Sequence, residues 1–359
     1  MKNKDVIQEE ALQALFPHYR AGANISMGVG KTLIGLRHMD KNYTDYCKFL
    51  VVAPKKAVMQ AWKDDAVKFG YQHLLPHITF TTYLSLDKQA DDFDVIYLDE
   101  CHNLLFSHDE WLSKFAGKIV GLTGTAPKFK TSEKGKMVDR YCPIVYTYDT
   151  DEAVDDEILN DYEIHIHMLS LNSAKTILIS HAGKEWYTSE QDVYNYWSRR
   201  IDDAQGPKAL QIARIQRMKK MMEFTSKEAL AIVLTGQIKD KCLIFANTME
   251  QADRLCQYRY HSNNPSSEDS LSAFKEGKIN KLSCVLQLSE GINIPHLKQS
   301  IILHAYGNER KTAQRIGRTL RLNPTEKAII NILCYKDTVD VRWVQDALAS
   351  FDQSKIKYL

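Results

Sequence analysis

The sequence predicts an α/β protein with two consecutive units, each built on a parallel β-sheet. Short apolar segments alternate with helical patterns in the first half of the 359 residues, and they do so again in the second half. Continuously apolar strands separated by helices are typical of parallel sheets that are covered on both faces. An acidic segment, Asp149–Glu163, separates the two series. We therefore expect one domain over 1–150 and a second domain over 151–359.

The expected strands of the first unit each precede a polar turn or the start of a helix. They are Ala23–Met27, Lys48–Ala53, His77–Phe80, Asp94–Leu98 and Lys118–Leu122. The expected strands of the second unit are Glu163–Leu169, Lys241–Ala246, Arg259–His261, Leu282–Gln287, Ser300–His304 and Ala328–Cys334. Few turn signals occur over 174–237, which predicts a helical insertion near the start of the second domain.

Composition excludes several classes of protein. Hydrophobic residues make up 44% and charged residues 26% of the chain, which is typical of soluble globular proteins. No apolar segment is long enough to cross a bilayer, and the N-terminus is charged where a secretory signal would be apolar. The seven cysteines form no C-x-x-C pair, which argues against a zinc site or a disulfide framework. We expect a cytoplasmic protein with no membrane partner.

A phosphate-binding loop is predicted where a strand leads into a helix over Asn24–Leu36. The turn itself consists of Gly28, Val29 and Gly30. Glycines let the backbone wrap closely, so that N–H groups at a helix N-terminus point at phosphate oxygens. Lys31 would reach the β- and γ-phosphates, and the Thr32 hydroxyl would coordinate Mg²⁺. The cofactors expected from this loop are ATP and Mg²⁺.

Two adjacent acids, Asp99 and Glu100, end an apolar strand about seventy residues after the loop. The carboxyl ends of parallel strands face the ligand crevice. Two acids at a buried strand end are costly unless a cation or a proton-transfer role keeps them there. We expect Asp99 to hold Mg²⁺ through its water shell and Glu100 to be the catalytic base that orients the attacking water. The alternative is a strand capped by polar turn residues, which the nearby loop disfavours.

Ordered segments over nearly the whole chain resemble the motifs of superfamily 2 helicases. Gly28–Thr32 resembles motif I, and the D-E-C-H at Asp99–His102 resembles the DExH form of motif II. Six further segments resemble motifs Ia, Ib, III, IV, V and VI. In that order they are Val51–Trp62, Thr79–Leu86, Gly121–Pro127, Lys241–Leu255, Ser289–Pro295 and Gln314–Arg321. In style they are most similar to chromatin-remodelling-type ATPases and phage branch-migration helicases of the UvsW type. The resemblance implies two tandem RecA-like P-loop domains with the ATP site in the cleft between them.

Motif VI supplies the catalytic residues that the resemblance places in the second domain. Arg318 and Arg321 would be arginine fingers, with Gln314 on the phosphate or the attacking water. An arginine that meets the charge building on the γ-phosphate is worth about 10³–10⁵ in rate. The two arginines lie three residues apart, so on a helix they share one face.

The resemblance also implies further nucleotide contacts and a coupling group. Nucleotide contacts are expected at Gln8, which would read the adenine edge, and at Gly291 and Asn293. Asn293 departs from the aspartate of many superfamily members, which puts a ribose contact in doubt. Coupling of the ATP state to the other domain is expected from His102, Thr123 and Thr125. For His102 the alternative is a structural hydrogen bond.

Nucleic-acid contacts are expected at strand ends and helix starts, where phosphates can be held without reading sequence. The candidates are Lys55, Lys56, Thr81, Thr82, Thr248 and Ser289. Trp62 either stacks a base or packs in the core. The net charge is only +2, but Arg199–Lys227 and Lys298–Lys327 are locally basic. These stretches either contact nucleic acid or are solvated faces.

The motif set predicts a nucleic-acid-dependent ATPase that translocates on DNA, single-stranded or branched, and unwinds or remodels it. Two alternatives stay open: an RNA helicase, and a nucleotide-gated nucleic-acid-binding module without strand movement. A compact chain of this kind is typical of phage or mobile-element genomes, which would place it in the host cytoplasm. We expect a monomer that acts in DNA replication, recombination or repair, with a protein partner as one means of targeting.

Overall fold

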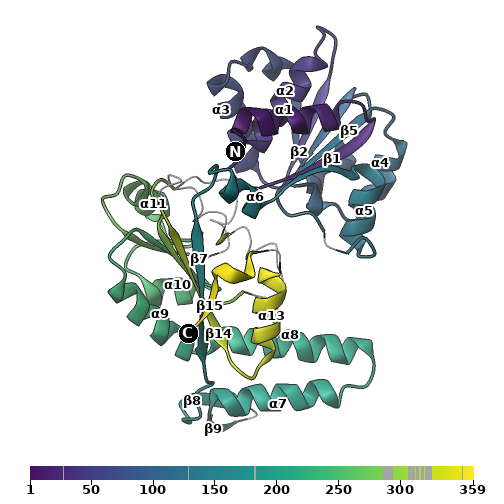
Figure 1. Ribbon diagram of the computed structural model, residues 1–359. Coiled ribbons are helices and arrows are strands. Elements are labelled where there is room, and N and C mark those ends of the chain that lie inside the picture. The colour runs from purple at the N-terminus through teal and green to yellow at the C-terminus, as the bar shows by residue number, and fades with distance from the viewer. Residues whose placement is uncertain are drawn as a thin grey trace. The chain divides into compact units, whose positions relative to one another are not determined.

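The structure, a computed structural model, divides into two compact units, and the first runs over Met1–Asp161 (Figure 1). Most of the chain from Tyr162 to Leu359 forms the second unit. The structure describes all residues except 27, 128, 182, 286–293, 306–311, 313–314, 317–318, 320–325 and 350. The two units are described separately below.

The first unit is built on a six-stranded, all-parallel sheet with the order β3-β2-β4-β5-β1-β6. Its strands are β1 (Arg20–Ile25), β2 (Phe49–Ala53), β3 (Ile78–Thr82), β4 (Val95–Asp99), β5 (Lys118–Thr123) and β6 (Ile144–Tyr148). Every residue of β2 and β4 is buried, as expected for central parallel strands. The predicted parallel α/β architecture is confirmed for this unit.

Helices cover both faces of the first sheet (Figure 1). They are α1 (Lys4–Leu15), α2 (Lys31–Lys41), α3 (Lys56–Lys68), α4 (Asp109–Lys114), α5 (Glu133–Tyr141) and α6 (Thr150–Asp155). On one face Leu50, Ile96 and Ile119 of the central strands pack with Leu112 of α4 and Met137 of α5. Helices α1, α2 and α3 cover the other face, on which the Asp99 side chain meets Trp62 of α3.

The acidic segment closes the first unit. Asp149 caps α6 through a reciprocal pair of hydrogen bonds with Glu152, and the Tyr148 hydroxyl donates to Asp156 at 3.0 Å. These local contacts hold α6 against β6. The compact unit therefore extends to Asp161, past the boundary expected near residue 150.

The second unit contains a seven-stranded parallel sheet with the order β11-β12-β10-β13-β14-β7-β15 among the described residues. Its strands are β7 (Tyr162–Leu169), β10 (Cys242–Phe245), β11 (Arg259–Tyr260), β12 (Lys281–Cys284), β13 (Gln299–Ile302), β14 (Ala328–Tyr335) and β15 (Ile356–Tyr358). All six strands predicted for this half are present, with ends shifted by a few residues. The last strand, β15, pairs with β7 at the sheet edge and was not predicted.

The predicted helical insertion over 174–237 is helical only from residue 190 onward. Residues 177–188 form an antiparallel hairpin of β8 (Ile177–His181) and β9 (Lys184–Thr188), so the prediction was wrong there. Gly183 adopts φ +76° in the connection, which suits a tight turn between short β-branched and aromatic segments. The helices of this unit are α7 (Glu190–Asp202), α8 (Pro207–Glu223), α9 (Ser226–Gln237), α10 (Met249–Leu255), α11 (Ser267–Lys275) and α13 (Val339–Leu348).

Three further features bear on the classes considered from composition. All seven cysteines are free thiols. Within the described ranges, no group of three or more His, Cys, Asp or Glu side chains is placed to hold a metal ion. No helix in that same part of the chain combines the length and apolar character needed to span a membrane.

Candidate active site

The loop between β1 and α2 has the backbone geometry of an anion-binding turn. Gly28 and Gly30 adopt φ of +95° and +104°, in the left-handed region that favours glycine. Helix α2 begins at Lys31 directly after Gly30, and no described side chain caps its first turn. The N–H groups at this helix start are therefore left for a ligand.

Gln8 of α1 braces this loop from behind. Its side-chain Nε2 donates to the Val29 carbonyl at 2.7 Å, and a Cβ atom on Gly30 would lie 2.7 Å from the same nitrogen. The Gln8 Oε1 atom is buried and meets no hydrogen-bond donor among the described residues. Burying an amide oxygen without a donor is costly. A bound ligand with an amino group, such as adenine, would supply that donor.

Two carboxylates face this loop from the end of β4. The Lys31 Nζ atom lies 3.9 Å from Glu100 Oε1, and both side chains are largely enclosed. Glu100 adopts φ +51°, an unusual conformation for a residue with a side chain, which is common at functional sites. Asp99 is buried, and its Oδ2 atom accepts the Trp62 indole N–H at 2.8 Å.

The two carboxyl groups differ in acidity. Burial and the neighbouring Glu100 charge raise the pKa of Asp99 to about 6, against the effects of Trp62 and Lys31. Burial also acts to raise the pKa of Glu100, but the Lys31 ammonium, the His102 imidazole and donors from Gly124 and Thr123 outweigh it and lower that pKa. Glu100 is thus held ionised, as a base requires, while burial and the Glu100 charge outweigh the effect of Lys31 at Asp99.

The predicted coupling residues gather around Glu100. The His102 Nδ1 atom lies 2.9 Å from the Thr123 hydroxyl, 3.4 Å from the Thr125 hydroxyl and 3.4 Å from Glu100 Oε2. The Thr123 hydroxyl is 3.4 Å from the same carboxylate oxygen and accepts the Thr125 N–H at 3.1 Å. Within this unit, His102 therefore makes the structural hydrogen bonds that were considered as an alternative role.

The described residues fit magnesium and a nucleoside triphosphate. The two glycines at positive φ turn the backbone into the start of α2, whose N–H groups can meet phosphates, and Lys31 supplies a cation beside them. Thr32 and Asp99 offer a hydroxyl and a carboxylate, the oxygen donors that Mg²⁺ prefers. A site that keeps water and phosphate on most positions of Mg²⁺ needs few protein ligands.

The expected nucleic-acid residues are not equally accessible. Lys55 and Lys56 are exposed at the start of α3. Thr81 is buried and its hydroxyl is directed at the Ser85 carbonyl, so it is not presented to a ligand. Thr82 is partly exposed. Thr248 caps α10 by accepting the Gln251 N–H at 3.1 Å, and its own O–H is directed at the Glu250 carboxylate.

Several predicted site residues lie outside the described residues, and their placement is not assessed. They are Ser289, Gly291, Asn293, Gln314, Arg318 and Arg321. Arg315, which lies between Gln314 and Arg318 in the chain, is described and fully buried. Its guanidinium donates to the His304 carbonyl at 3.0 Å.

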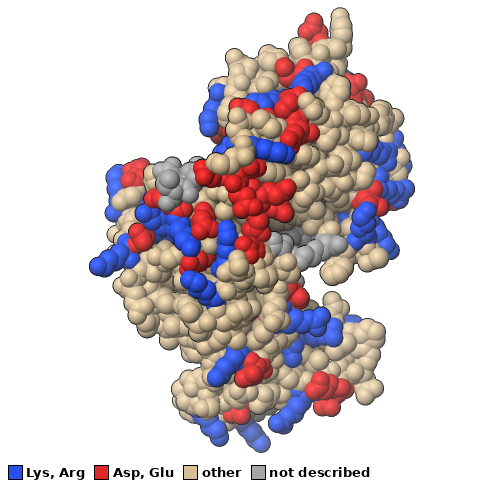
Figure 2. Space-filling view, in the orientation of Figure 1, with Lys and Arg blue, Asp and Glu red and all other residues tan. Residues whose placement is uncertain are grey.

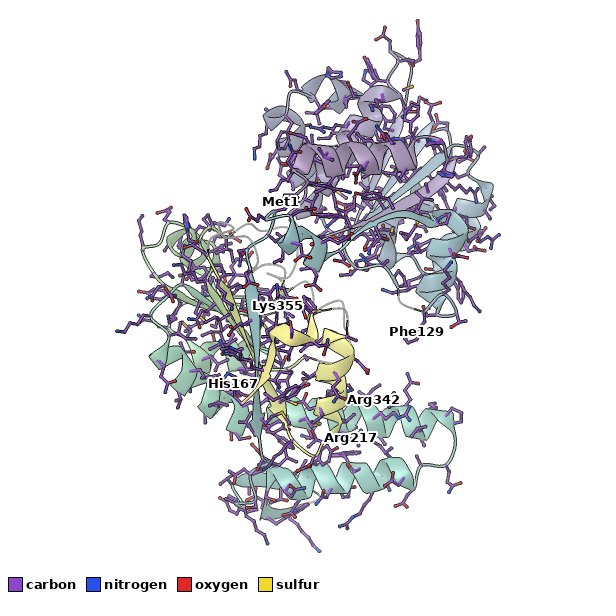
Figure 3. The ribbon with its side chains drawn as sticks, viewed as in Figure 1. Met1, Phe129, His167, Arg217, Arg342 and Lys355 are labelled. Carbon is purple, nitrogen blue, oxygen red and sulfur yellow. The ribbon has the colours of Figure 1, made fainter. Side chains whose placement is uncertain are left out.

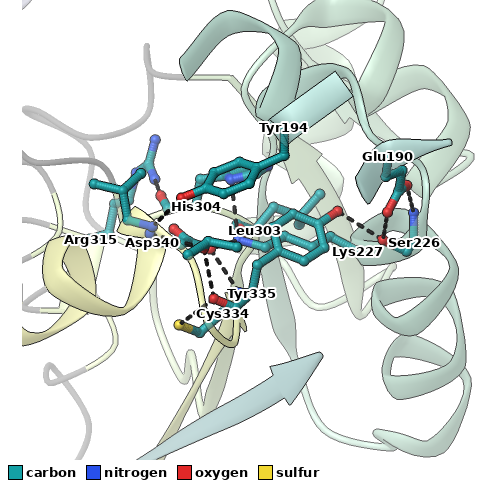
Figure 4. A network of polar contacts seen from close by, with 12 residues as sticks. Glu190, Tyr194, Ser226, Lys227, Leu303, His304, Arg315, Cys334, Tyr335 and Asp340 are labelled. Atoms are coloured by element: carbon teal, nitrogen blue, oxygen red, sulfur yellow. Dashed lines mark hydrogen bonds and ion pairs between the residues drawn. The ribbon is translucent and has the colours of Figure 1, made fainter. Parts of the chain in front are cut away.

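A buried polar network surrounds that carbonyl in the second unit (Figure 4). Lys227 of α9 is fully buried and contacts Asp340 Oδ2 at 2.5 Å, the Leu303 carbonyl at 2.9 Å and His304 Nδ1 at 3.1 Å. Burial lowers the pKa of Lys227, against the effect of the Asp340 charge. The network thus joins α9 and α13 to the chain segment that leads to Arg315.

The α7–α8 hairpin carries basic residues of two kinds. Arg217 lies with its guanidinium over the Tyr194 ring at 5.3 Å and donates to Ser198, so it joins the two helices (Figure 3). Arg199, Arg200 and Arg214 are exposed. Lys and Arg side chains along these helices are interspersed with Asp and Glu (Figure 2). The basic stretch is therefore partly packing and partly solvated surface.

Trp62 and Asp65 are site residues that were missed or left open from sequence. Trp62 is only 1% exposed, so it cannot stack a base, and it holds Asp99 instead. The Thr32 hydroxyl stabilises the Asp65 carboxylate, although burial raises the pKa of Asp65 overall. The sequence feature that could have linked Trp62 and Asp65 is their spacing of three residues, which places both side chains on one face of α3.

Two family models match the chain. "Type III restriction enzyme, res subunit" matches residues 5–128, and "Helicase conserved C-terminal domain" matches residues 225–323. The "DNA 3'-5' translocase XPB2" of Sulfurisphaera tokodaii is 22% identical over 382 residues, covering 93% of this chain and 82% of that protein. The family matches fall in the first and second units, in the order that the motifs predict.

Solved structures share the fold at low sequence identity. The "ATP-dependent Type ISP restriction-modification enzyme LlaBIII bound to DNA" has a TM-score of 0.62 at 14% identity and covers all of this chain, which spans only 31% of that enzyme. "S. cerevisiae Dbp5 bound to RNA and ADP BeF3" has a TM-score of 0.60 at 14% identity, covering 98% of this chain and 89% of that protein. The units are thus RecA-like domains in tandem, and the fold alone does not distinguish DNA from RNA.

Proposed function

Because the chain belongs to the superfamily 2 helicases and translocases, we propose that it is an ATP-dependent translocase that moves along DNA. One observation in the first unit carries this proposal. The Lys31 Nζ atom lies 3.9 Å from Glu100 Oε1, next to the loop in which Gly28 and Gly30 adopt positive φ. The relative named as a DNA 3'-5' translocase favours DNA over RNA and a 3'-to-5' direction.

The proposed site residues of the first unit would each have a defined part in hydrolysis. Lys31 would bind the β- and γ-phosphates, and Thr32 and Asp99 would hold a magnesium ion, whose charge would offset that of the phosphates. Glu100, kept ionised by its neighbours, orients the attacking water and accepts its proton. Gln8 offers its buried Oε1 atom to the adenine amino group.

The second unit would complete the reaction. Arg318 and Arg321 meet the charge that develops on the γ-phosphate, and Gln314 orients the water or the phosphate. Gly291 and Asn293 contact the nucleotide from the same unit. His102, Thr123 and Thr125 surround Glu100, so they are placed to respond when the bound nucleotide changes. Closure of two domains on ATP and reopening after hydrolysis would move the strand.

The strand would be held by Lys55, Lys56 and Thr82 in the first unit and by Thr248 and Ser289 in the second. The exposed arginines of the α7–α8 hairpin are candidates for contacts with a duplex. We propose forked or branched DNA as the substrate and a monomer as the active form, with a partner protein for targeting. A role in phage-like replication, recombination or repair fits the style of the motifs.

The test is ATPase activity against single-stranded, duplex, forked and four-way DNA and RNA. We expect DNA to stimulate hydrolysis, Lys31→Ala to abolish nucleotide binding and hydrolysis, and Glu100→Gln to bind ATP without hydrolysing it. Stimulation by RNA alone would identify an RNA helicase. A rate that no nucleic acid changes would favour a nucleotide-gated binding module, and full activity of either variant would refute the site.

A further inference from the structure

A side-chain hydrogen bond joins helix α3 to β4, the strand that ends at Asp99. The Trp62 indole N–H donates to Asp99 Oδ2 at 2.8 Å in a buried environment. A hydrogen bond from a neutral donor to a buried carboxylate is directional and worth more than an ordinary one. It fixes which carboxylate oxygen remains for a metal-bound water.

The same indole also rests on the helix that carries Lys31 and Thr32. A Cβ atom on Gly35 of α2 would lie 2.3 Å from Trp62 Cη2 and 3.0 Å from Cζ3. Only glycine leaves room for the ring at this distance. Trp62 is thus wedged between α2 and the end of β4, the two elements that supply the proposed magnesium ligands.

Asp65 makes a second connection from α3. It lies on the same helix face as Trp62; burial raises its pKa, and Lys68 and the Thr32 hydroxyl act against that rise. Helix α3 therefore contacts both proposed ligand residues, Asp99 through Trp62 and Thr32 through Asp65.

The beginning of α3 is the proposed nucleic-acid contact. Lys55 and Lys56 are exposed where β2 leads into the helix. From Lys56 to Trp62 the helix axis advances roughly 9 Å, at about 1.5 Å per residue. A short α-helix is stiff over this distance, so a displacement of its start is transmitted to Trp62 and Asp65.

We propose that α3 links strand binding to the magnesium site, with Trp62 and Asp65 as positioning residues for Asp99 and Thr32. This inference rests on the proposed function of the chain. A phosphate held by Lys55 and Lys56 would settle α3 in the position in which both ligands are correctly oriented, and so raise the hydrolysis rate.

The test replaces Trp62 with Phe, which keeps most of the ring and removes the donor. Binding of the fluorescent nucleotide mant-ADP is titrated with Mg²⁺ in the full chain, and hydrolysis is measured with and without a single-stranded DNA oligonucleotide. We expect Trp62→Phe to need about tenfold more Mg²⁺ for half-maximal binding, the factor of one hydrogen bond to a charged group. We also expect DNA stimulation to fall by a similar factor.

The matched control is Trp111→Phe. The Trp111 indole N–H donates to the Gln89 carbonyl at 2.9 Å in the same unit, so this variant also loses an indole hydrogen bond, but one to a neutral acceptor away from the site. It should keep the Mg²⁺ dependence and the DNA stimulation of the parent. Asp65→Asn, at a half-buried position, should shift both readouts in the same direction as Trp62→Phe even if the latter folds poorly.

The inference is overturned if Trp62→Phe and Asp65→Asn keep the parent's Mg²⁺ dependence and DNA stimulation, or if Trp111→Phe loses them equally. Failure of the proposed function has a different signature. The parent would then show no hydrolysis with any nucleic acid, while the Mg²⁺ titration of mant-ADP binding would still compare the variants. A parent that bound no nucleotide at all would refute both.

Discussion

At the residue scale, Gly30 is constrained both by its backbone and by its surroundings. Its φ of +104° lies in the left-handed region, and a side chain there would meet the Gln8 amide. Gly70 shares the first constraint, with φ +82°, but a Cβ atom on it would meet nothing within 4 Å. Comparing substitutions at Gly30 and Gly70 therefore separates the effect of backbone strain from the effect of crowding in the phosphate loop.

We expect Gly30→Ala and Gly70→Ala each to lower the free energy of unfolding by about 1–2 kcal/mol, because L-residues are disfavoured at positive φ. Only Gly30→Ala should also weaken mant-ADP binding, since it displaces Gln8 from Val29. Urea denaturation and nucleotide titration measure the two effects. Equal nucleotide affinity of the two variants would show that the loop does not depend on this close contact.

His38 makes the first unit sensitive to acid. Burial, with smaller contributions from Lys118 and Lys41, lowers the pKa of His38 to about 3, and its Nδ1 atom lies 2.7 Å from the Tyr97 hydroxyl. In the unfolded chain the His38 imidazole becomes protonated near pH 6.5, whereas in the folded chain it stays neutral until about pH 3. The His38 contribution to stability is therefore complete above about pH 6.5 and is lost as the pH falls, by about 1.4 kcal/mol per unit.

We predict that His38→Gln loses about 2–3 kcal/mol less stability than the parent between pH 6.5 and pH 4.5. Glutamine can still hydrogen-bond Tyr97 but does not titrate. The measurement is the free energy of unfolding from urea denaturation at several pH values. His18→Gln, at an exposed histidine, is the control and should follow the parent. Parallel curves for His38→Gln and the parent would contradict the assignment.

At the element scale, the predicted strands include the continuously buried β2 and β4, and the edge strands β3 and β11 were predicted as well. The strands that were missed are exposed or lie at an edge: β6, β8, β9 and β15. An edge strand needs only one buried face, so its local sequence carries a weaker signal than a central strand does. β15 exists because β7 offers it a partner far away in the sequence.

The Lys227–Asp340 pair is an element-scale contact of the same long-range kind, because it joins α9 to α13 (Figure 4). Lys227→Met would leave the buried Asp340 charge without its cation and should cost about 3–5 kcal/mol of unfolding free energy. The double variant Lys227→Met, Asp340→Asn should cost less, since asparagine can still accept the Tyr335 N–H.

Lys220→Met is the matched control for this pair. Lys220 also makes an ion pair, with Glu223 at 2.8 Å, but its side chain is 44% exposed, so its loss should cost only about 0–1 kcal/mol. The free energies of unfolding of the three variants, measured by chemical denaturation, test this prediction. If Lys227→Met were no more destabilised than Lys220→Met, the network would not anchor the segment that leads to Arg315.

At the scale of the whole molecule, the first unit brings together the phosphate loop and the Asp99–Glu100 pair that the sequence motifs singled out. The phosphate loop and the Asp99–Glu100 pair are each local in sequence, so their chemistry is legible without a structure. Trp62 was ambiguous because its partner, Asp99, is reached only through the packing of α3 on the sheet. Thr81 was expected to contact nucleic acid and is buried, with its hydroxyl directed at the Ser85 carbonyl.

The proposed role of Arg318 as an arginine finger predicts that Arg318→Ala separates nucleotide binding from hydrolysis. The residues proposed to bind the phosphates lie in the first unit, so nucleotide affinity should change by no more than a few-fold. The rate should fall by about 10³–10⁵, because the charge on the γ-phosphate would lose its arginine in the transition state. Arg342→Ala, at an arginine of α13 that is 82% exposed, should hydrolyse ATP like the parent. Stopped-flow mant-ATP binding and DNA-stimulated ATPase rates test both, and a parent-like rate for Arg318→Ala would mean that hydrolysis is completed without this residue.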